Sequence, residues 1–141
     1  MKFAILMLAA AVGQQAQADT FDLECAGTLT SQSYYSGKTT EPYTSHYRLD
    51  LTSKQWCEGE CVALHPLIAA QPTFLVLEQT KTDTPSETKT IQNQIDRRTG
   101  QQTVFLLSAY PGHPSESMIM KWEGTCRRLD FTGFPTFRTA F

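Results

Sequence analysis

Ser117-Met118-Ile119-Met120-Lys121-Trp122-Glu123-Gly124-Thr125-Cys126 is the most informative segment of this chain, because its side chains alternate in character. One face carries Met118, Met120, Trp122, Gly124 and Cys126, and apart from Ile119 the other face is polar. A period of two residues is typical of a half-buried β-strand. The segment therefore predicts a strand that ends in a cysteine on its apolar face.

A second cysteine occupies an equivalent position near the start of the chain. Residues 20–29 also alternate, and the apolar face carries Phe21, Leu23 and Cys25. A disulfide between Cys25 and Cys126 would make the first and last strands neighbours, so that the sheet closes on itself. Gly27 continues the inner face and allows another backbone to approach closely.

The first 18 residues have the pattern of an export signal. Lys2 forms a short basic region, and the apolar residues 3–12 are too few to span a bilayer as a helix. Ala16-Gln17-Ala18 has the small residues of a cleavage site. We expect cleavage after Ala18, which leaves residues 19–141 as one domain in the periplasm or outside the cell.

Charge and hydropathy limit the partners of the mature chain. Without Lys2 it has 11 basic and 14 acidic residues, so it lacks the basic surplus that nucleic-acid binding requires. No stretch after the signal is apolar for about 18 residues, so no transmembrane helix is expected. The size is that of an ordinary monomeric domain with its own core.

Four cysteines in an exported chain indicate two disulfides, although four cysteines allow three pairings. Strand parity favours Cys25–Cys126. A short turn with a central Gly59 favours Cys57–Cys61. A metal site is the alternative for this second pair, with its nearby ligands drawn from Glu58, Glu60 and His65.

The rest of the chain predicts more strands and no helix of any length. Further strands are expected near residues 43–52, 62–65, 73–80, 88–97 and 102–110, with loops at 31–42 and 110–114 and a tight turn at Gly100. We therefore predict an all-β fold, a single antiparallel meander that forms a closed or nearly closed β-barrel of about seven or eight strands.

The C-terminal tail is aromatic, with phenylalanines at Phe131, Phe134, Phe137 and Phe141. We expect this tail to pack on one end of the barrel. An exposed apolar patch that binds a partner is the first alternative. An outer-membrane strand ending in Phe141 is the second, although Pro135 would interrupt it.

No catalytic, cofactor-binding or metal-binding motif is present. His46, His65 and His113 lack partners at motif spacing, and no serine lies in a Gly-x-Ser-x-Gly elbow. Asp96 and Glu123 could meet across strands, but their basic neighbours indicate solvated faces. We therefore expect a non-enzymatic binding module without cofactors, and a small hydrolase with an unrecognised site is the alternative.

Two modes of binding are possible. A small apolar ligand could enter the mouth of the barrel, whose interior is expected to be lined by Trp122, Met118, Met120, Phe105 and Tyr47. Tyr43 shares the apolar face of its strand with Tyr47. Alternatively, the loops with Tyr34, Tyr35, Tyr110 and His113 could bind a protein, for example as an inhibitor of an extracellular hydrolase, since tyrosine offers both apolar area and a hydroxyl. A fully packed interior would exclude the first mode.

A set of residues spread over most of the mature chain resembles small exported bacterial proteins of unassigned function. The set comprises Phe21-x-Leu23-x-Cys25-x-Gly27, Trp56-Cys57 with Cys61, Asp96-Arg97-Arg98-Thr99-Gly100, Gly124-x-Cys126 and Phe131-Thr132-Gly133-Phe134-Pro135. The resemblance implies a bacterial source and a periplasmic or secreted location, and it implies no activity or ligand. In architecture alone, the expected barrel is similar to lipocalin-like and small periplasmic inhibitor barrels.

The long disulfide should dominate stability. A crosslink across about 100 residues contributes roughly 4–5 kcal/mol by the chain-entropy model, against about 2 for the Cys57–Cys61 ring. We expect Cys25→Ala to lower the melting temperature strongly and to reproduce most of the effect of a reducing agent. An unchanged thermal melt of Cys25→Ala would contradict the closing role of this disulfide.

Overall fold

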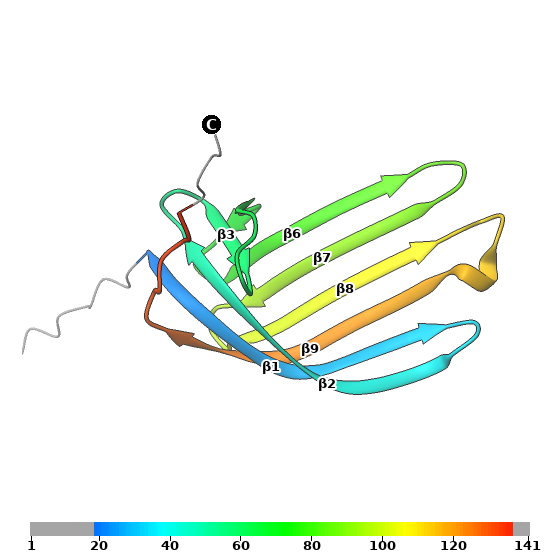
Figure 1. The fold of residues 1–141 in the computed structure, drawn as a ribbon, viewed down its shortest axis with the longest axis horizontal. Coiled ribbons are helices and arrows are strands. Elements are labelled where there is room, and N and C mark those ends of the chain that lie inside the picture. Colours follow the sequence, from blue (N-terminus) through cyan, green and yellow to red (C-terminus); the bar gives the residue numbers. More distant parts are fainter. Residues whose placement is uncertain (1–18, 137–141) are drawn as a thin grey trace, which may run out of the picture.

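The computed structural model describes residues 19–136, and within them every long element is a β-strand. Nine strands form one antiparallel sheet (Figure 1). Their bounds are β1 Thr20–Ser33, β2 Gly37–Asp50, β3 Gln55–Glu58, β4 His65–Pro66, β5 Ala69–Ala70, β6 Phe74–Asp83, β7 Thr88–Asp96, β8 Gln101–Ala109 and β9 Met118–Leu129, with a 3₁₀ turn, η1 Pro114–Glu116, between the last two. The predicted export signal and the tail residues Phe137 and Phe141 lie outside the described residues.

The strand order along the sheet is β4-β3-β2-β1-β9-β8-β7-β6-β5. Each strand pairs with its neighbours in sequence, except that β1 pairs with β9 and that β4 and β5 are not paired. The prediction of an antiparallel all-β meander with its first and last strands side by side is therefore confirmed.

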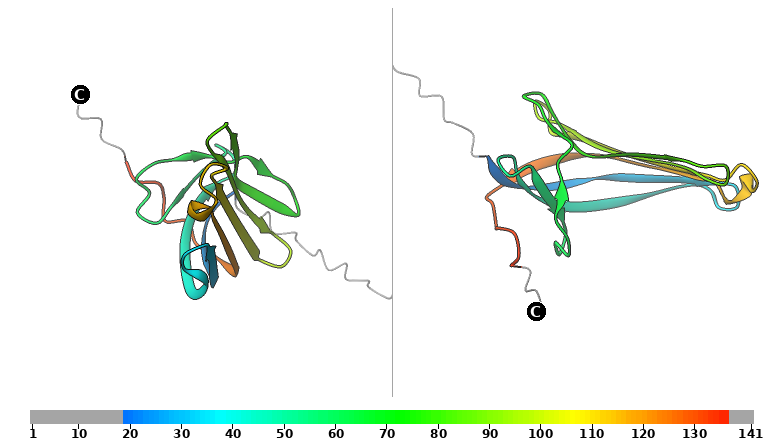
Figure 2. Two further views of the ribbon diagram at one scale, coloured as in Figure 1. Left: turned by 90° about the vertical axis from the view of Figure 1, so that its right-hand side faces the viewer. Right: turned by 90° about the horizontal axis from the view of Figure 1, so that it is seen from above.

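The predicted closure and strand number are wrong, because the sheet is an open, curled half-barrel of nine strands (Figure 2). Its break lies between β4 and β5, which are two residues long and joined through Leu67 and Ile68. Such short edge strands offer few groups to a partner, and Pro66 has no amide hydrogen to donate across the gap.

The Cys25–Cys126 disulfide joins β1 to β9 in the middle of the sheet, with its Cα atoms 3.9 Å apart. Gly27 lies opposite Gly124 two residues along the same ladder. Neither glycine has room for a side chain, because a Cβ on Gly27 would lie 2.1 Å from the Glu123 carbonyl oxygen. The close approach that Gly27 predicted is thus confirmed, and this glycine pair lets the two strands meet beside the disulfide.

The hydrophobic core gathers where β1 begins and β9 ends. The inward-facing side chains of both halves of the sheet meet there, and the buried cluster consists of Phe21, Leu23, Cys25, Tyr47, Leu49, Trp56, Leu67, Leu75, Leu77, Ile95 and Cys126. The alternation of β1 and β9 accounts for this packing, because each strand turns every second residue inward.

Beyond the core, the strands continue as a thin curved sheet (Figures 1 and 2), whose residues are mostly exposed or partly exposed. The predicted loop at residues 31–42 is wrong, since β1 runs to Ser33 and β2 starts at Gly37, opposite it. Both faces are solvated there, so the sequence has no apolar alternation, and the ladder alone shapes the segment. Pro42 has no amide hydrogen to donate, and β2 tolerates it because β2 pairs with β3 only over residues 47–50, so no strand lies on that side of Pro42.

The second predicted disulfide, Cys57–Cys61, is also present and closes the turn after β3. The expected strand from Val62 is wrong, because Val62 is 87% exposed and pairing begins only at His65. Cys61 has a φ of +54°, so the backbone turns away from the ladder at this point. The strand that follows is therefore short, and this shortness leaves the half-barrel open.

The C-terminal tail packs at the core end, on the outer face of β1 and β2. Asp22 is fully buried there and accepts a 2.7 Å hydrogen bond from the Thr132 hydroxyl, while Arg48 donates a 2.9 Å bond to the Gly133 carbonyl. Phe131 and Phe134 stack edge to face at 5.3 Å. The described part of the tail therefore covers a polar pair on the outside of the sheet.

Two disulfides are consistent with an exported protein. Among residues 19–136 no helix is long and apolar enough to cross a membrane.

The glycine pair gives a direct test of the β1–β9 contact. We expect Gly27→Ala to lower the free energy of unfolding by about 1–3 kcal/mol, because its Cβ meets backbone atoms that cannot move aside. Gly112→Ala is the matched control, with open space around its Cβ, and should change the stability by less than about 0.5 kcal/mol. Equal urea midpoints for both variants would contradict the close approach.

Candidate functional site

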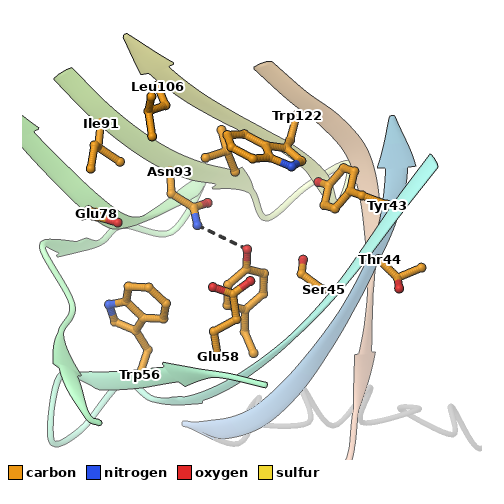
Figure 3. Close-up of a pocket in the computed structure, with 12 residues that line it drawn as sticks. Tyr43, Thr44, Ser45, Trp56, Glu58, Glu78, Ile91, Asn93, Leu106 and Trp122 are labelled. Atoms are coloured by element: carbon orange, nitrogen blue, oxygen red, sulfur yellow. Dashed lines mark hydrogen bonds between the residues drawn. The ribbon is translucent and has the colours of Figure 1, made fainter. Parts of the chain in front are cut away.

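The concave face of the half-barrel holds a groove of about 390 Å³ next to the core (Figure 3). Both halves of the sheet contribute to its wall. The residues that line it are Tyr43, Thr44, Ser45, Tyr47, Trp56, Glu58, Glu78, Ile91, Asn93, Val104, Leu106 and Trp122. A groove of this size lies within the range of about 300–1,000 Å³ that small-molecule sites occupy.

Aromatic and aliphatic side chains form most of the wall. Trp122 on β9 and Tyr43 on β2 lie edge to face, with ring centroids 6.4 Å apart. Tyr47 and Trp56 form a second pair at 5.8 Å. Tyr43 and Trp122 meet because β1 alone separates β2 from β9 and the curl of the sheet turns their side chains towards each other, whereas Tyr47 and Trp56 lie on the paired strands β2 and β3. The wall can therefore receive an apolar body.

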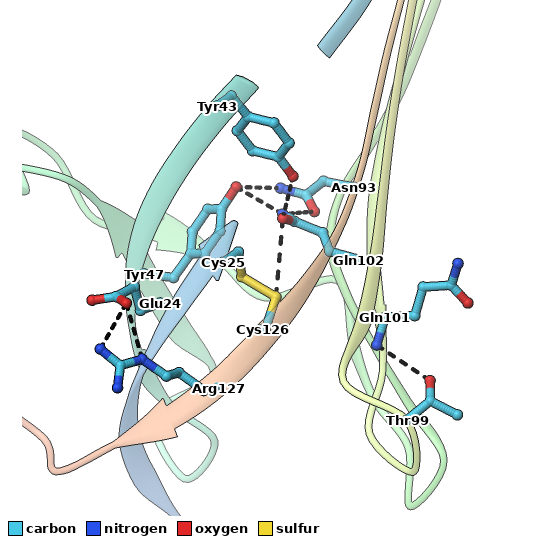
Figure 4. Close-up of a disulfide and its surroundings, with 10 residues drawn as sticks. All are labelled: Glu24, Cys25, Tyr43, Tyr47, Asn93, Thr99, Gln101, Gln102, Cys126 and Arg127. Carbon is cyan, nitrogen blue, oxygen red and sulfur yellow. Dashed lines mark hydrogen bonds and ion pairs between the residues drawn. A yellow bond between two sulfur atoms is a disulfide. The ribbon is translucent and has the colours of Figure 1, made fainter. Parts of the chain in front are cut away.

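The floor of the groove is a buried hydrogen-bond network centred on Gln102 (Figure 4). The Gln102 amide nitrogen donates to the Tyr47 hydroxyl at 2.8 Å and to Asn93 Oδ1 at 3.1 Å, and its Oε1 accepts from the Tyr43 hydroxyl at 2.8 Å. Gln102 is fully buried, and Asn93 is 5% exposed. This network separates the packed core from the groove and fixes the rings of Tyr43 and Tyr47.

Burial changes the acidity of both tyrosines. Desolvation raises the pKa of Tyr43 to about 12, and the pKa of Tyr47 also rises, mainly through desolvation. The two phenols therefore stay neutral over the whole physiological range. They act as hydrogen-bonding groups with fixed positions.

Two carboxylates stand at the opening, Glu58 at the end of β3 and Glu78 on β6. Glu58 is exposed as a residue, yet the protein shields its carboxyl group enough that desolvation raises its pKa. The Tyr47 hydroxyl lowers this pKa, and the nearby Glu78 raises it. The two acids are thus close enough to interact.

A β-bulge turns Glu78 inward. Val76 pairs with Gln94 and Glu78 pairs with Asn93, so Leu77 is an extra residue in the ladder. Leu77 is 1% exposed and packs in the core. Simple alternation after Leu77 would place Glu78 outside, whereas the bulge shifts the parity by one and points Glu78 into the groove. Of the four successive apolar residues of this strand, Leu75, Val76 and Leu77 are buried and Phe74 is 40% exposed.

The residues predicted for binding loops lie elsewhere, at the distal end of the sheet. Tyr34 and Tyr35 form the β1–β2 turn and are 76% and 79% exposed. Tyr110 and His113 lie in the β8–β9 connection, next to that turn because Ser33 pairs with Met118. The fold therefore brings both predicted loops to one end, away from the groove.

The acidic residues weighed for catalysis are surface ion pairs. Asp96 lies 2.7 Å from Arg98, which lowers the pKa of this carboxyl to about 2, and Glu123 lies 2.8 Å from Lys121. Within residues 19–136 no three His, Cys, Asp or Glu side chains are grouped to hold a metal ion.

Of the residues predicted to line the interior, Trp122 and Tyr47 line the groove, and Met118 and Met120 do not. The inward position predicted for Phe105 is wrong, because Phe105 alternates with Val104 and Leu106, which face the groove.

Gln102, Asn93 and Glu78 were not predicted for the site. Gln102 and Asn93 carry no motif, but Gln102 shares its face with Val104 and Leu106, so strict alternation along β8 would have marked it as a buried amide. No pattern in the sequence marks Glu78, because the bulge reverses its orientation.

In comparisons with known proteins, no family model, curated protein or solved structure matches the chain.

The floor network can be tested by removing its central amide. We expect Gln102→Leu to cost about 2–4 kcal/mol of unfolding free energy, because it leaves the buried Tyr47 hydroxyl and the Asn93 amide without this partner. Gln101→Leu is the matched control, since Gln101 is exposed and points away in Figure 4. Equal urea midpoints for the two variants would show that the network contributes nothing.

Proposed function

We propose that this protein is an exported, non-enzymatic binding module that holds a small, largely apolar molecule in the groove of the half-barrel. The export signal that the sequence predicts and the two disulfides support a periplasmic or secreted location. No resident cofactor is part of the proposal.

The observation that carries it is the open groove of about 390 Å³ between paired aromatic rings. Such a groove leaves apolar surface in contact with water, and a ligand that covers it gains the hydrophobic free energy of both surfaces. The Gln102 network holds Tyr43 and Tyr47 in place before binding, so little side-chain entropy is lost when a ligand enters.

The distal end supports a second candidate, the binding of a protein such as an extracellular hydrolase. Tyr34 and Tyr35 are highly exposed there, and Tyr34 lines a hollow of about 230 Å³ together with Ser33 and Ile119. Exposed tyrosines at a hairpin tip are common in protein recognition. The hollow at this end is smaller than the groove, at about 230 Å³ against about 390 Å³.

The groove can be probed with N-phenyl-1-naphthylamine, a neutral apolar dye. The chain has two tryptophans, Trp56 and Trp122, and both line the groove. We expect saturable binding of one dye per chain, with energy transfer from tryptophan to the dye. Leu106→Trp should weaken binding about tenfold or more, because the larger ring fills the groove.

The control is Phe105→Trp, which puts the same ring on the outer face of β8, opposite Lys121. Circular dichroism and thermal melts of both variants show whether each is folded. A folded wild-type protein that does not bind the dye, or equal dye affinity in both variants, would contradict the groove as the site.

A further inference from the structure

The groove has an unbalanced charge. Glu58 and Glu78 are the charged side chains among the residues that line it, and no lysine or arginine lines it. The ion pairs of residues 19–136 are formed by other carboxylates, so neither Glu58 nor Glu78 has an ion-pair partner there. His65 is the basic side chain that acts on Glu58, and it lowers the pKa of this carboxyl less than the other causes change it. The opening of the groove therefore has a negative potential.

The two carboxylates belong to opposite sides of the half-barrel. Glu58 lies on β3 and Glu78 on β6, and each of these strands is second from one edge of the sheet. The break between β4 and β5 leaves the two acids across the opening from each other, where like charges repel. A cation placed between them would relieve this repulsion and interact with both.

The walls next to these acids are aromatic. Trp56 is paired with Tyr47, and the Tyr47 hydroxyl also interacts with Glu58. The faces of tryptophan and tyrosine rings attract ammonium groups, most strongly where water is partly excluded. Low-dielectric walls around a cleft of one sign also concentrate counter-ions in it.

We propose that the groove selects amphipathic cations, with an amine held between Glu58 and Glu78 and an apolar body against Trp122 and Tyr43. This inference rests on the proposed binding function and specifies the chemical class of its ligand. The aromatic cavity provides the site, and the two acids set the sign of the charge that it accepts.

Three naphthalene probes of nearly equal shape test it by titration calorimetry. They are 1-naphthylmethylamine as the cation, 1-naphthalenemethanol as the neutral probe and 1-naphthaleneacetate as the anion. We expect the amine to bind about three- to tenfold more tightly than the alcohol, as interactions with two partly exposed carboxylates allow, and the acetate more weakly than the alcohol. Added salt should reduce the advantage of the amine and leave the alcohol unchanged.

Glu58→Gln and Glu78→Gln should each reduce the preference for the amine without changing the affinity for the alcohol. Both substitutions keep the shape of the side chain and remove its charge. Glu60→Gln is the matched control, because this exposed glutamate two residues beyond Glu58 does not line the groove.

The outcomes separate the two proposals. If the alcohol binds and the amine binds no better, or if Glu60→Gln reduces the preference as much as the other variants, the selection for cations is overturned while the groove remains a binding site. If folded protein binds none of the three probes, this inference falls together with the proposed function. Loss of the amine preference in Glu58→Gln and in Glu78→Gln, but not in Glu60→Gln, would support the selection for cations.

Discussion

The pairing of β1 with β9 is the constraint on which the rest of the structure depends. It joins the first and last strands over twelve register pairs, from Asp22 with Leu129 to Ser33 with Met118. Gly27 and Gly124 allow the backbones to come together, and the Cys25–Cys126 disulfide locks the register beside them. Because one covalent bond joins residues 101 positions apart, the unfolded chain loses much of its freedom, and the hairpins on either side are placed relative to each other.

The position of the break follows from this central pairing. A meander whose end strands pair must leave any gap between two consecutive strands, and here the gap lies between the two shortest strands, β4 and β5. The tight Cys57–Cys61 turn and Pro66 keep these edge strands short. Beside the core, the short link between β4 and β5 connects the two edges of the sheet. Among residues 19–136, no other segment connects these edges away from the core. The packed core and the open groove are thus two halves of one curved surface, and the Gln102 network is the boundary between them.

The sequence predicts what depends on alternation and fails where alternation is absent or interrupted. The alternation of Phe21, Leu23 and Cys25 on one strand, and of Trp122, Gly124 and Cys126 on another, predicted the correct faces, the Cys25–Cys126 disulfide and the neighbouring end strands. The Cys57–Cys61 disulfide was predicted from its short turn. The distal hairpin could not be predicted, because a strand solvated on both faces has no hydrophobic period, and closure could not be judged without the lengths of β3 to β5. At the site, Tyr43 and Tyr47 were placed on the correct face. The inward orientation of Glu78 could not be predicted, since the extra residue Leu77 reverses the face to which each later side chain of the strand points.

The groove is a better candidate site than the distal tyrosines for a reason of entropy. Tyr34 and Tyr35 contact each other at 5.4 Å, but they stand on a turn of an exposed hairpin, so a partner would have to order them on binding. Tyr43 and Tyr47 are already held by Gln102 and Asn93, and their neighbours Trp122 and Trp56 are fixed by ring contacts. A buried amide network costs stability unless every member is satisfied, and this one is arranged to present aromatic rings to an open cavity. A protein that needed only a stable core could fill the same space with leucine, so the network is consistent with the binding role proposed for the groove.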